Sequence, residues 1–313
     1  ACVPIVHQAL AVAQADVRNV FDIRVALAAP ISFAQIKDCF ADKLEWSQRL
    51  SWNSKQKRVE GTEELVLGSL ILETRPCAEP EPKAALRLLL KAVGDQKLEP
   101  LPWTSHTRSV QQRLQFMHRR RPDQWPDRSD AWLKANLENW CGQQLLGSRS
   151  FADLKGLSLE EGLWEGVSSE QRQELDRLLP STWELPSGRS VDIDYSDEDP
   201  ALSGKLQEFF GCAETPTVLD GTLPLVVNLM SPAGRPMQIT RDLSRFWAGS
   251  YKEVRKDGAA KYPRHPWPED PLTVAPTTKT NRVLRKEAEE TQGQATDTSK
   301  GNSKSSSKGK SKR

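Results

Sequence analysis

The chain has 313 residues, of which 37% are hydrophobic and 27% are charged, and its formal net charge is +2 at pH 7. These values suit two or three folded domains with polar surfaces, and no apolar run reaches the roughly 18 residues that a membrane-spanning helix needs. Charge is unevenly placed, because the segment from Lys279 to the end holds ten Lys/Arg and four Asp/Glu while the rest is mildly acidic. A basic tail on an acidic body favours a polyanionic partner.

The five cysteines lie far apart in the sequence, and no pair has C-x-x-C spacing or a histidine close by. They are Cys2, Cys39, Cys77, Cys141 and Cys212. Disulfides and zinc sites are therefore less expected than buried free thiols. Free thiols are typical of a reducing compartment, so we expect a cytoplasmic protein.

Residues 1–77 predict a small β-rich domain. Apolar residues alternate over 21–27, which is typical of a half-buried strand, and Ser32 with Gln35 has the spacing of a helical capping box. The segment 52–73 predicts two strands around a turn near Gly61. A strand, a helix and a hairpin are compatible with an OB-type barrel, complete or incomplete at its start, although the pattern does not require one.

Residues 78–180 predict a bundle of short helices. Apolar residues recur at helical spacing over 86–93, 110–117, 133–140 and 175–179, and loops rich in Gly, Pro and Ser separate these stretches. We expect Ser129 to cap the third helix, and Gly94 and Pro180 to mark the ends of the first and last.

Residues 181–276 predict a C-terminal α+β domain. A hairpin is expected to turn at Pro186–Gly188, and a helix capped by Asp199 is expected to run from Pro200 to Gly211. An apolar strand over 223–230 and a helix capped by Thr240 follow.

Five prolines between Pro263 and Pro276 exclude a helix or a central strand there. Large rings favour burial, so we interpret this segment as a proline-rich arm that lies across a folded body. The expected packing anchors are Phe246, Trp247, Tyr262 and Trp267. Residues 277–313 hold few apolar residues and predict a disordered basic tail.

The C-terminal sequence DLSRFWAGSYKEVRKDGAAKYPRHPWPEDPL at 242–272 resembles the end of HrpB-type proteins, the bacterial DExH-box ATP-dependent RNA helicases. LQEFFG, ETPTV and LMSPAGRPMQITRDLSRFW precede it in the order and spacing of that family, and WPDRSDAWLKANLENW and LVLGSLIL resemble it less sharply. The resemblance implies an α+β multidomain region that follows the helicase motor, with a small β-domain, a helical domain and a C-terminal domain.

The chain departs from the family in its catalytic motifs. It contains no G-x-x-x-x-G-K-[ST] phosphate loop and no Asp-Glu-x-His motif, so ATPase and unwinding activity are assigned to no residue. ATP and magnesium belong to the family's motor, and we expect no cofactor, no metal and no ATP hydrolysis in this chain alone.

Asp192 and Asp194 on one strand face could hold a divalent metal, but the alternative is a solvated edge strand. Ser187 lacks the G-x-S-x-G context of a nucleophile.

Basic side chains are the candidate RNA contacts. The planar guanidinium of arginine suits phosphate, and a basic strand beside Trp52 would suit an OB-type stacking groove. The candidates are Lys55, Lys57, Arg58, Arg108, Arg113, Arg119, Arg120 and Arg121. The alternative interpretation of the arginines is a solvated helix face that is favoured by the helix dipole.

These observations predict an accessory region of an HrpB-type helicase that binds or guides single-stranded RNA while motor domains, in cis or in trans, hydrolyse ATP. The alternative is a protein-interaction module, whose Trp-rich helices and proline arm dock a partner without touching RNA.

Overall fold

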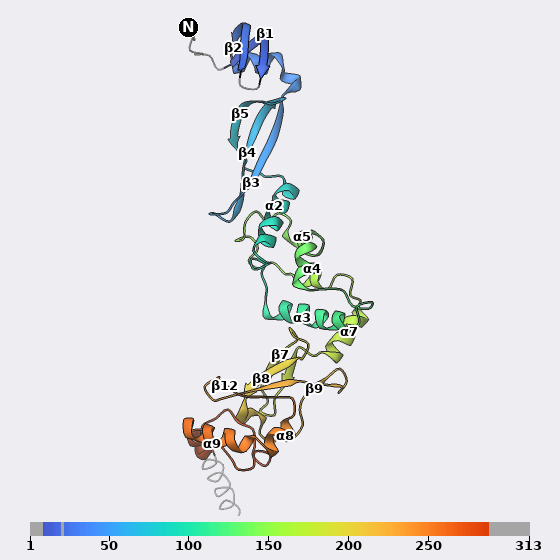
Figure 1. Cartoon of the computed structure of the whole chain (residues 1–313), viewed down its shortest axis with the longest axis vertical. Coiled ribbons are helices and arrows are strands. Elements are labelled where there is room, and N and C mark those ends of the chain that lie inside the picture. Colours follow the sequence, from blue (N-terminus) through green and yellow to red (C-terminus); the bar gives the residue numbers. More distant parts are fainter. Residues whose placement is uncertain (1–8, 20–21, 288–313) are drawn as a thin grey trace, which may run out of the picture. The chain divides into compact units, whose positions relative to one another are not determined.

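The computed structural model describes residues 9–19 and 22–287 (Figure 1). Within them the fold is mixed α+β, as predicted. The chain divides into two compact units, and each is built from two separate stretches. We call Ala1–Trp103 with Asp130–Gly162 the N-terminal unit, and Thr104–Ser129 with Leu163–Arg313 the C-terminal unit. The predicted helical segment 78–180 contributes helices to both, and the domain boundaries predicted at 77, 180 and 276 stay predictions.

The N-terminal unit begins with strands and continues with helices. Its elements are β1 (Ala9–Asn19), β2 (Asp22–Ile31), α1 (Phe33–Cys39), the 3-10 helix η1 (Ala41–Lys43), β3 (Glu45–Asn53), β4 (Arg58–Leu67), β5 (Leu70–Pro76), α2 (Pro82–Asp95), α4 (Asp130–Ala135) and α5 (Leu137–Leu145). The predicted capping box is confirmed, since Ser32 Oγ accepts the Gln35 N–H and Gln35 Oε1 accepts the Ser32 N–H. Val25 and Leu27 of β2 are exposed, so the predicted half-burial is wrong for them; Phe21 lies outside the described residues.

The described strands of this unit form two antiparallel sheets, β1–β2 and β3–β4–β5 (Figure 1). An OB-type barrel therefore stays a prediction. The turn expected near Gly61 is wrong, because Gly61 lies inside β4 opposite Leu50. A β-carbon at Gly61 would lie 2.5 Å from the Arg49 carbonyl oxygen, so this glycine permits close strand approach rather than a turn. The chain turns instead at 54–57 and at 68–69.

Helix α2 packs its apolar face into the core of this unit. Glu81 caps the helix and Pro82 opens it, while Leu89 and Val93 are fully buried. Gly94 does not end the helix as predicted; a β-carbon there would lie 3.4 Å from Leu137 Cδ1 of α5. The single helix expected over 133–140 is two helices, because Asn136 leaves the helical conformation between α4 and α5.

The C-terminal unit contains α3, a short helical layer and a sheet. Its elements are α3 (Ser105–Arg120), α7 (Ser169–Leu178), β6 (Thr182–Glu184), β7 (Ser190–Asp194), β8 (Ala201–Lys205), the 3-10 helix η2 (Leu206–Phe209), β9 (Thr217–Val218), β10 (Leu223–Pro224), β11 (Val226–Met230), β12 (Pro236–Thr240), α8 (Leu243–Ala248) and α9 (Tyr251–Lys261). The short helix α6 (Glu160–Leu163) has its first three residues in the N-terminal unit. The predicted hairpin is confirmed, with its turn between β6 and β7.

The described strands β12-β11-β8-β7-β6 form a mixed sheet in that order, in which only the β8–β11 pair is parallel. The helix predicted from Pro200 to Gly211 is wrong, because Ala201–Lys205 is strand β8. Pairing with β7 and β11 overrides the local helix signal, and Leu202 and Gly204 face the core in alternation. Thr240 accepts the Asp242 N–H, and Asp242 rather than Thr240 caps α8.

An aromatic cluster closes the core beneath this sheet. Phe246 and Trp247 have ring centroids 4.8 Å apart, and Trp247 and Tyr251 lie 5.2 Å apart edge to face. Trp247 Nε1 donates to the Cys212 carbonyl at 2.7 Å, and Tyr251 Oη donates to the Pro268 carbonyl at 2.8 Å. The polar atoms at the edges of the Trp247 and Tyr251 rings thus have hydrogen-bond partners, while the faces of the rings pack against one another.

Residues 263–276 contain no helix or strand, as their prolines predict. Residues 277–287, predicted as part of a disordered tail, have defined contacts instead. The Thr277 N–H donates to the Gln207 carbonyl, the Asn281 N–H donates to the Arg264 carbonyl, and residues 281–287 are helical. The remainder of the predicted tail, 288–313, lies outside the described residues.

In the part of the chain that the structure describes, no helix is long and apolar enough to cross a membrane. Among the described cysteines, Cys141 is buried, and burial raises the pKa of its thiol to about 12. Cys39 is exposed, so the prediction of buried thiols is wrong at that position.

Candidate nucleic-acid interface

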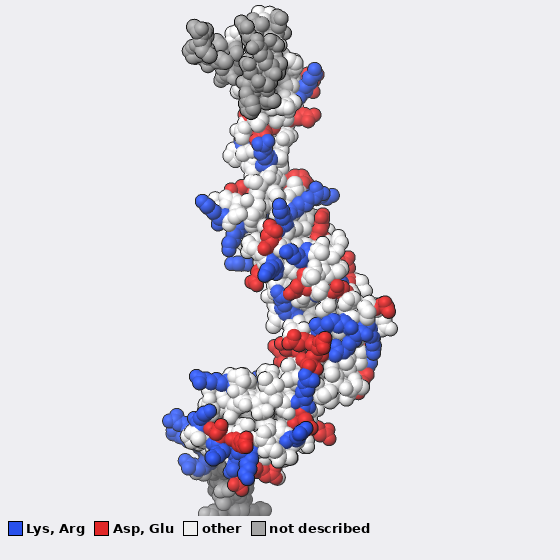
Figure 2. Space-filling view, in the orientation of Figure 1, with Lys and Arg blue, Asp and Glu red and all other residues white. Residues whose placement is uncertain are grey.

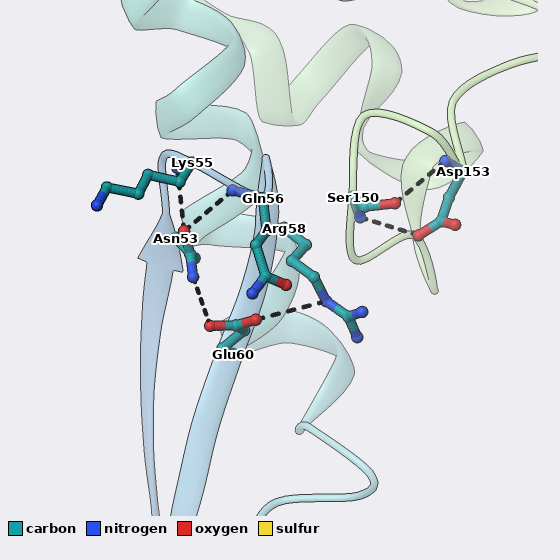
Figure 3. Close-up of polar contacts among 7 residues, drawn as sticks. All are labelled: Asn53, Lys55, Gln56, Arg58, Glu60, Ser150 and Asp153. Atoms are coloured by element: carbon teal, nitrogen blue, oxygen red, sulfur yellow. Dashed lines mark hydrogen bonds and ion pairs between the residues drawn. The ribbon is translucent and has the colours of Figure 1, made fainter.

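The turn between β3 and β4 carries the first group of predicted contacts. Asn53 Oδ1 accepts the N–H groups of Lys55 and Gln56, both at 3.0 Å, and Asn53 Nδ2 donates to Glu60 Oε2 at 2.7 Å (Figure 3). Such an Asx turn is a local alternative to continued strand pairing. Lys55 and Lys57 therefore lie in a turn, and the prediction that they lie on a strand is wrong.

A second segment, residues 149–155, lines up beside this turn. The Val59 N–H donates to the Arg149 carbonyl at 2.7 Å, and the Phe151 N–H donates to the Lys57 carbonyl at 3.2 Å. Asp153 accepts the Arg149 and Ser150 N–H groups, which hold the pKa of its carboxyl below the usual value (Figure 3). Backbone pairing thus fixes the segment against the turn.

The two predicted cations at the end of this turn differ in direction. In Figure 3, Lys55 points away from Arg58, whose guanidinium extends on the side of Ser150. Arg58 lies 4.0 Å from Glu60, at the limit of an ion pair, and its side chain is half exposed. Because an exposed ion pair of this length contributes little free energy, Arg58 remains available to bind a second anion.

The arginines of α3 are placed differently. Arg113 is 3% exposed, donates from Nε to the Leu179 carbonyl at 2.6 Å and pairs with Asp176. Its prediction as an RNA contact is wrong, because burial and internal partners occupy the guanidinium. Arg108 donates to Gln111 at 3.0 Å on the same helix.

The three arginines at the end of α3 contact the C-terminal unit itself. Arg119 donates to the carbonyl oxygens of Tyr195, Ser196 and Asp197, at 3.3, 3.1 and 2.8 Å. Arg120 donates to the Glu198 carbonyl and lies 3.7 Å from the Phe116 ring centroid, and Arg121 contacts Glu174. Figure 2 shows basic side chains next to acidic ones in the region of α3 and β7. These arginines fix a loop and are less available to phosphate.

The four predicted anchors all contact the packed body. Phe246 and Trp247 are buried, while Tyr262 and Trp267 are half-buried. Trp267 Nε1 donates to the Tyr262 carbonyl at 3.0 Å, and Arg255 Nε donates to the Trp267 carbonyl at 3.0 Å. The ring lies directly on the backbone of Gly258 in α9, where a β-carbon would be 2.2 Å from Trp267 Cη2.

Catalytic or metal chemistry has little support in the described residues. No group of three or more His, Cys, Asp or Glu there could hold a metal. Asp192 and Asp194 are exposed on β7, which lies between β6 and β8 and is not an edge strand. Ser187 Oγ lies 3.5 Å from Glu208 Oε1, and Glu208 is committed to Arg189 through two hydrogen bonds of 2.6 and 2.7 Å.

Sequence reasoning missed Phe151 and Lys155, which lie beside the β3–β4 turn and face the same cavity as Lys57 and Arg58. They follow the turn by roughly ninety residues, so no local spacing connects them. The signal in the sequence that points to them is an aromatic residue and a lysine within a polar loop after α5.

Comparison with known proteins identifies the C-terminal part. The family described as "ATP-dependent helicase C-terminal", HrpB_C, matches residues 140–271. This segment is similar to the C-terminal domain of HrpB-type helicases. The chain is also 35% identical over 263 residues to the ATP-dependent RNA helicase HrpB of Escherichia coli K12, a match that covers 83% of the chain and 32% of that relative.

Solved structures agree with this assignment. A crystal structure of the E. coli DExH-box NTPase HrpB matches with a TM-score of 0.57 and 33% identity, covering 87% of this chain and 34% of that one. A crystal structure of the E. coli DEAH/RHA helicase HrpB matches with a TM-score of 0.50 and 33% identity, covering 72% and 29%. The chain thus spans about a third of the relatives it matches, and the resemblance to HrpB-type helicases is confirmed.

Proposed function

We propose that this chain acts as the accessory region of an HrpB-type RNA helicase and binds single-stranded RNA for a motor that lies in cis or in trans. The observation that carries the proposal is the basic turn between β3 and β4. Lys55 and Lys57 lie in the turn and Arg58 begins β4, all three are exposed, and Arg58 has only a marginal ion pair. Exposed cations that internal partners do not hold are the groups that neutralise phosphates.

The chain contains no residues of the motor's catalytic motifs. The sequence has no phosphate loop and no DExH motif, so we infer that the chain as given hydrolyses no ATP. Its contribution would be to hold RNA by charge and stacking, which gives binding without sequence preference.

The test is binding of a fluorescent, unstructured RNA across a salt series. Each phosphate neutralised on a single strand contributes about 0.7 to the slope of log affinity against log salt. Replacing Lys55, Lys57 and Arg58 by glutamine should therefore reduce the slope by about 2 if each contacts one phosphate. The fold should be unaffected, because exposed charges contribute little to stability.

The matched control removes two lysines and one arginine from the exposed face of α2, as Lys83→Gln, Arg87→Gln and Lys91→Gln. This variant makes the same change in net charge within the same unit and should keep most of the slope. An equal loss in both variants would show a diffuse charge effect, and absence of RNA binding at low salt would reject the proposal.

Protein docking is the second candidate, and one observation favours it. Val12, Val25 and Leu27 of the β1–β2 hairpin are 48%, 47% and 61% exposed. Extended exposed apolar surface marks interaction sites, and these three residues belong to one hairpin. If the basic turn proves indifferent to RNA, this hairpin becomes the preferred functional surface, with helicase motor domains as the expected partner.

A further inference from the structure

We propose that the cavity beside the β3–β4 turn binds one nucleotide of single-stranded RNA, with its base against Phe151 and its phosphate held by Lys57, Arg58 and Lys155. The inference rests on the proposed function and adds a defined site to it.

The cavity has a volume of about 630 Å³, within the range of about 300–1,000 Å³ that is usual for ligand sites. Three segments of the N-terminal unit form it: the β3–β4 turn, the residues after α2 and the segment 149–155. It is lined by Gln56, Lys57, Arg58, Gln96, Glu99, Pro100, Ser150, Phe151, Ala152 and Lys155. Backbone hydrogen bonds join the first and third segments, so two of its walls are held together.

The charge of the lining suits a phosphate. Three lining residues are cations, and Glu99 is the acidic residue among them. Within the described residues, no ion pair involves Lys57 or Lys155, and both are exposed. The neighbouring carboxylates have other donors, because Glu60 accepts from Asn53 and Asp153 accepts from two backbone N–H groups. A phosphate would therefore meet two lysines that have no ion pair and one arginine, Arg58, whose charge Glu60 and Asp153 compensate only in part.

The same cavity offers an aromatic surface. Phe151 is half-buried, and its ring centroid lies 4.9 Å from that of Trp52, which supports it from within the unit. Bases stack on such rings without regard to sequence. The amides of Gln56 and Gln96 and the carboxylate of Glu99 add donors and acceptors that could meet a base edge or a 2′-hydroxyl.

Backbone strain at this cavity allows a test that separates binding from stability. Lys57 has φ +54°, and Lys97, next to the lining residue Gln96, has φ +51°. Glycine adopts this left-handed conformation without steric cost, whereas lysine does not. Lys57→Gly and Lys97→Gly therefore remove the same charge and relieve the same strain, but only Lys57 lines the cavity.

We expect both variants to melt at or above the wild-type temperature. Lys57→Gly should weaken binding of an unstructured RNA and lower the salt slope by about 0.7, while Lys97→Gly should leave the slope unchanged. Lys155→Gln should repeat the effect of Lys57→Gly, with Lys91→Gln of α2 as its control. Equal slopes for Lys57→Gly and Lys97→Gly would overturn the site.

The aromatic half of the site is tested with Phe151→Leu. It should weaken RNA binding roughly 5- to 150-fold, which corresponds to the loss of one stacking ring. The loss should vanish with an oligonucleotide of the same length that lacks bases, because nothing then stacks. Phe40→Leu, an exposed ring elsewhere in this unit, is the control and should have no effect. An equal loss for RNA and for the abasic strand would contradict the stacking role.

The outcomes separate this site from the general function. Strong binding of RNA by the wild type with no effect of Lys57→Gly, Lys155→Gln or Phe151→Leu would reject the cavity and leave the proposed function standing. Absence of RNA binding would reject both. Competition by millimolar inorganic phosphate, without any dependence on bases, would assign the cavity to a free anion and overturn the proposal for RNA.

Discussion

The absence of a side chain at Gly258 determines where the ring of Trp267 can lie. The ring occupies the space that a β-carbon at Gly258 would need, with Cη2, Cζ3 and Cζ2 at 2.2, 2.4 and 2.6 Å from that position. Two hydrogen bonds fix the ring, one from its Nε1 to Tyr262 and one from Arg255 to its backbone carbonyl. Glycine in the middle of a helix normally lowers stability, so its place in α9 reflects this contact.

We expect Gly258→Ala to destabilise the C-terminal unit by about 1–3 kcal/mol, because overpacking outweighs the gain of about 0.5–1 kcal/mol in helix formation. On the background of Trp267→Ala the clash is gone, and the same substitution should become stabilising by that smaller amount. Urea denaturation of the four proteins in this cycle measures both effects. If Gly258→Ala changed the free energy of unfolding in the same direction in both backgrounds, the proposed contact between Gly258 and Trp267 would be wrong.

At the scale of elements, Glu208 attaches the β6–β7 hairpin to η2. The carboxylate is fully buried, accepts two hydrogen bonds from Arg189 of the hairpin turn and accepts the Lys205 N–H at 2.8 Å. Burial alone would raise the pKa of Glu208, but the bonds from Arg189 and Lys205 outweigh it and hold the pKa below 4.5. A carboxyl whose folded pKa is depressed stabilises the fold above its unfolded pKa and loses that contribution as pH falls through the folded value.

Arg189→Ala should therefore lower the free energy of unfolding by about 2–3 kcal/mol at pH 7, because Glu208 is left buried without its strongest donors. The difference from wild type should shrink as pH falls, because without Arg189 the burial of Glu208 raises its pKa, so the variant takes up the proton at a higher pH than the wild type does. Denaturation curves between pH 3 and pH 7 provide the measurement. Arg241→Ala is the control: its pair with Asp199 is exposed, and its removal should cost at most about 1 kcal/mol at any pH.

Elements with local signals were predicted well, and those that depend on distant partners were not. The capping box at Ser32 and the turn at Pro186–Gly188 depend on residues within a few positions, and both are confirmed. Asp199–Pro200 has an equally clear helix signal, yet β8 forms there because two strands flank it. Glycine at position 61 predicts a turn by its residue type, whereas the close approach of Leu50 that requires glycine there cannot be seen in the sequence.

The candidate site was predictable to the same degree. The cations of the β3–β4 turn stand together in the sequence, so charge clustering found them. The segment that completes the cavity reaches the turn only through backbone bonds such as Phe151 N–H to Lys57, which no spacing reveals. Arg113 was misjudged because a run of arginines without acids gives no indication that Asp176 and the Leu179 carbonyl lie against it.

At the scale of the whole molecule, the first part of the basic C-terminal segment, residues 277–287, is held by hydrogen bonds. The Thr277 and Asn281 N–H groups donate hydrogen bonds to the Gln207 and Arg264 carbonyl oxygens, respectively. Asn281 Nδ2 also donates to the His265 carbonyl at 3.2 Å. Beyond residue 287 the sequence is rich in Lys, Ser and Gly and holds almost no apolar residue.

Deleting 288–313 should leave the melting temperature unchanged, whereas deleting 277–313 should lower it by a few degrees through loss of these contacts. Differential scanning calorimetry of the two truncated chains measures the comparison. A fall in melting temperature on removal of 288–313 alone would show that this stretch docks.

The two units are interleaved along the chain, since Thr104–Ser129 belongs to the second unit but precedes Asp130–Gly162 of the first. During synthesis, α3 leaves the ribosome long before Asp176 and Tyr195, the residues that cover Arg113 and Phe116. The first unit is equally incomplete until residue 162 has emerged. The first unit can therefore complete its fold only after the α3 segment of the second unit has already emerged, and α3 must wait without its packing partners until Asp176 and Tyr195 follow.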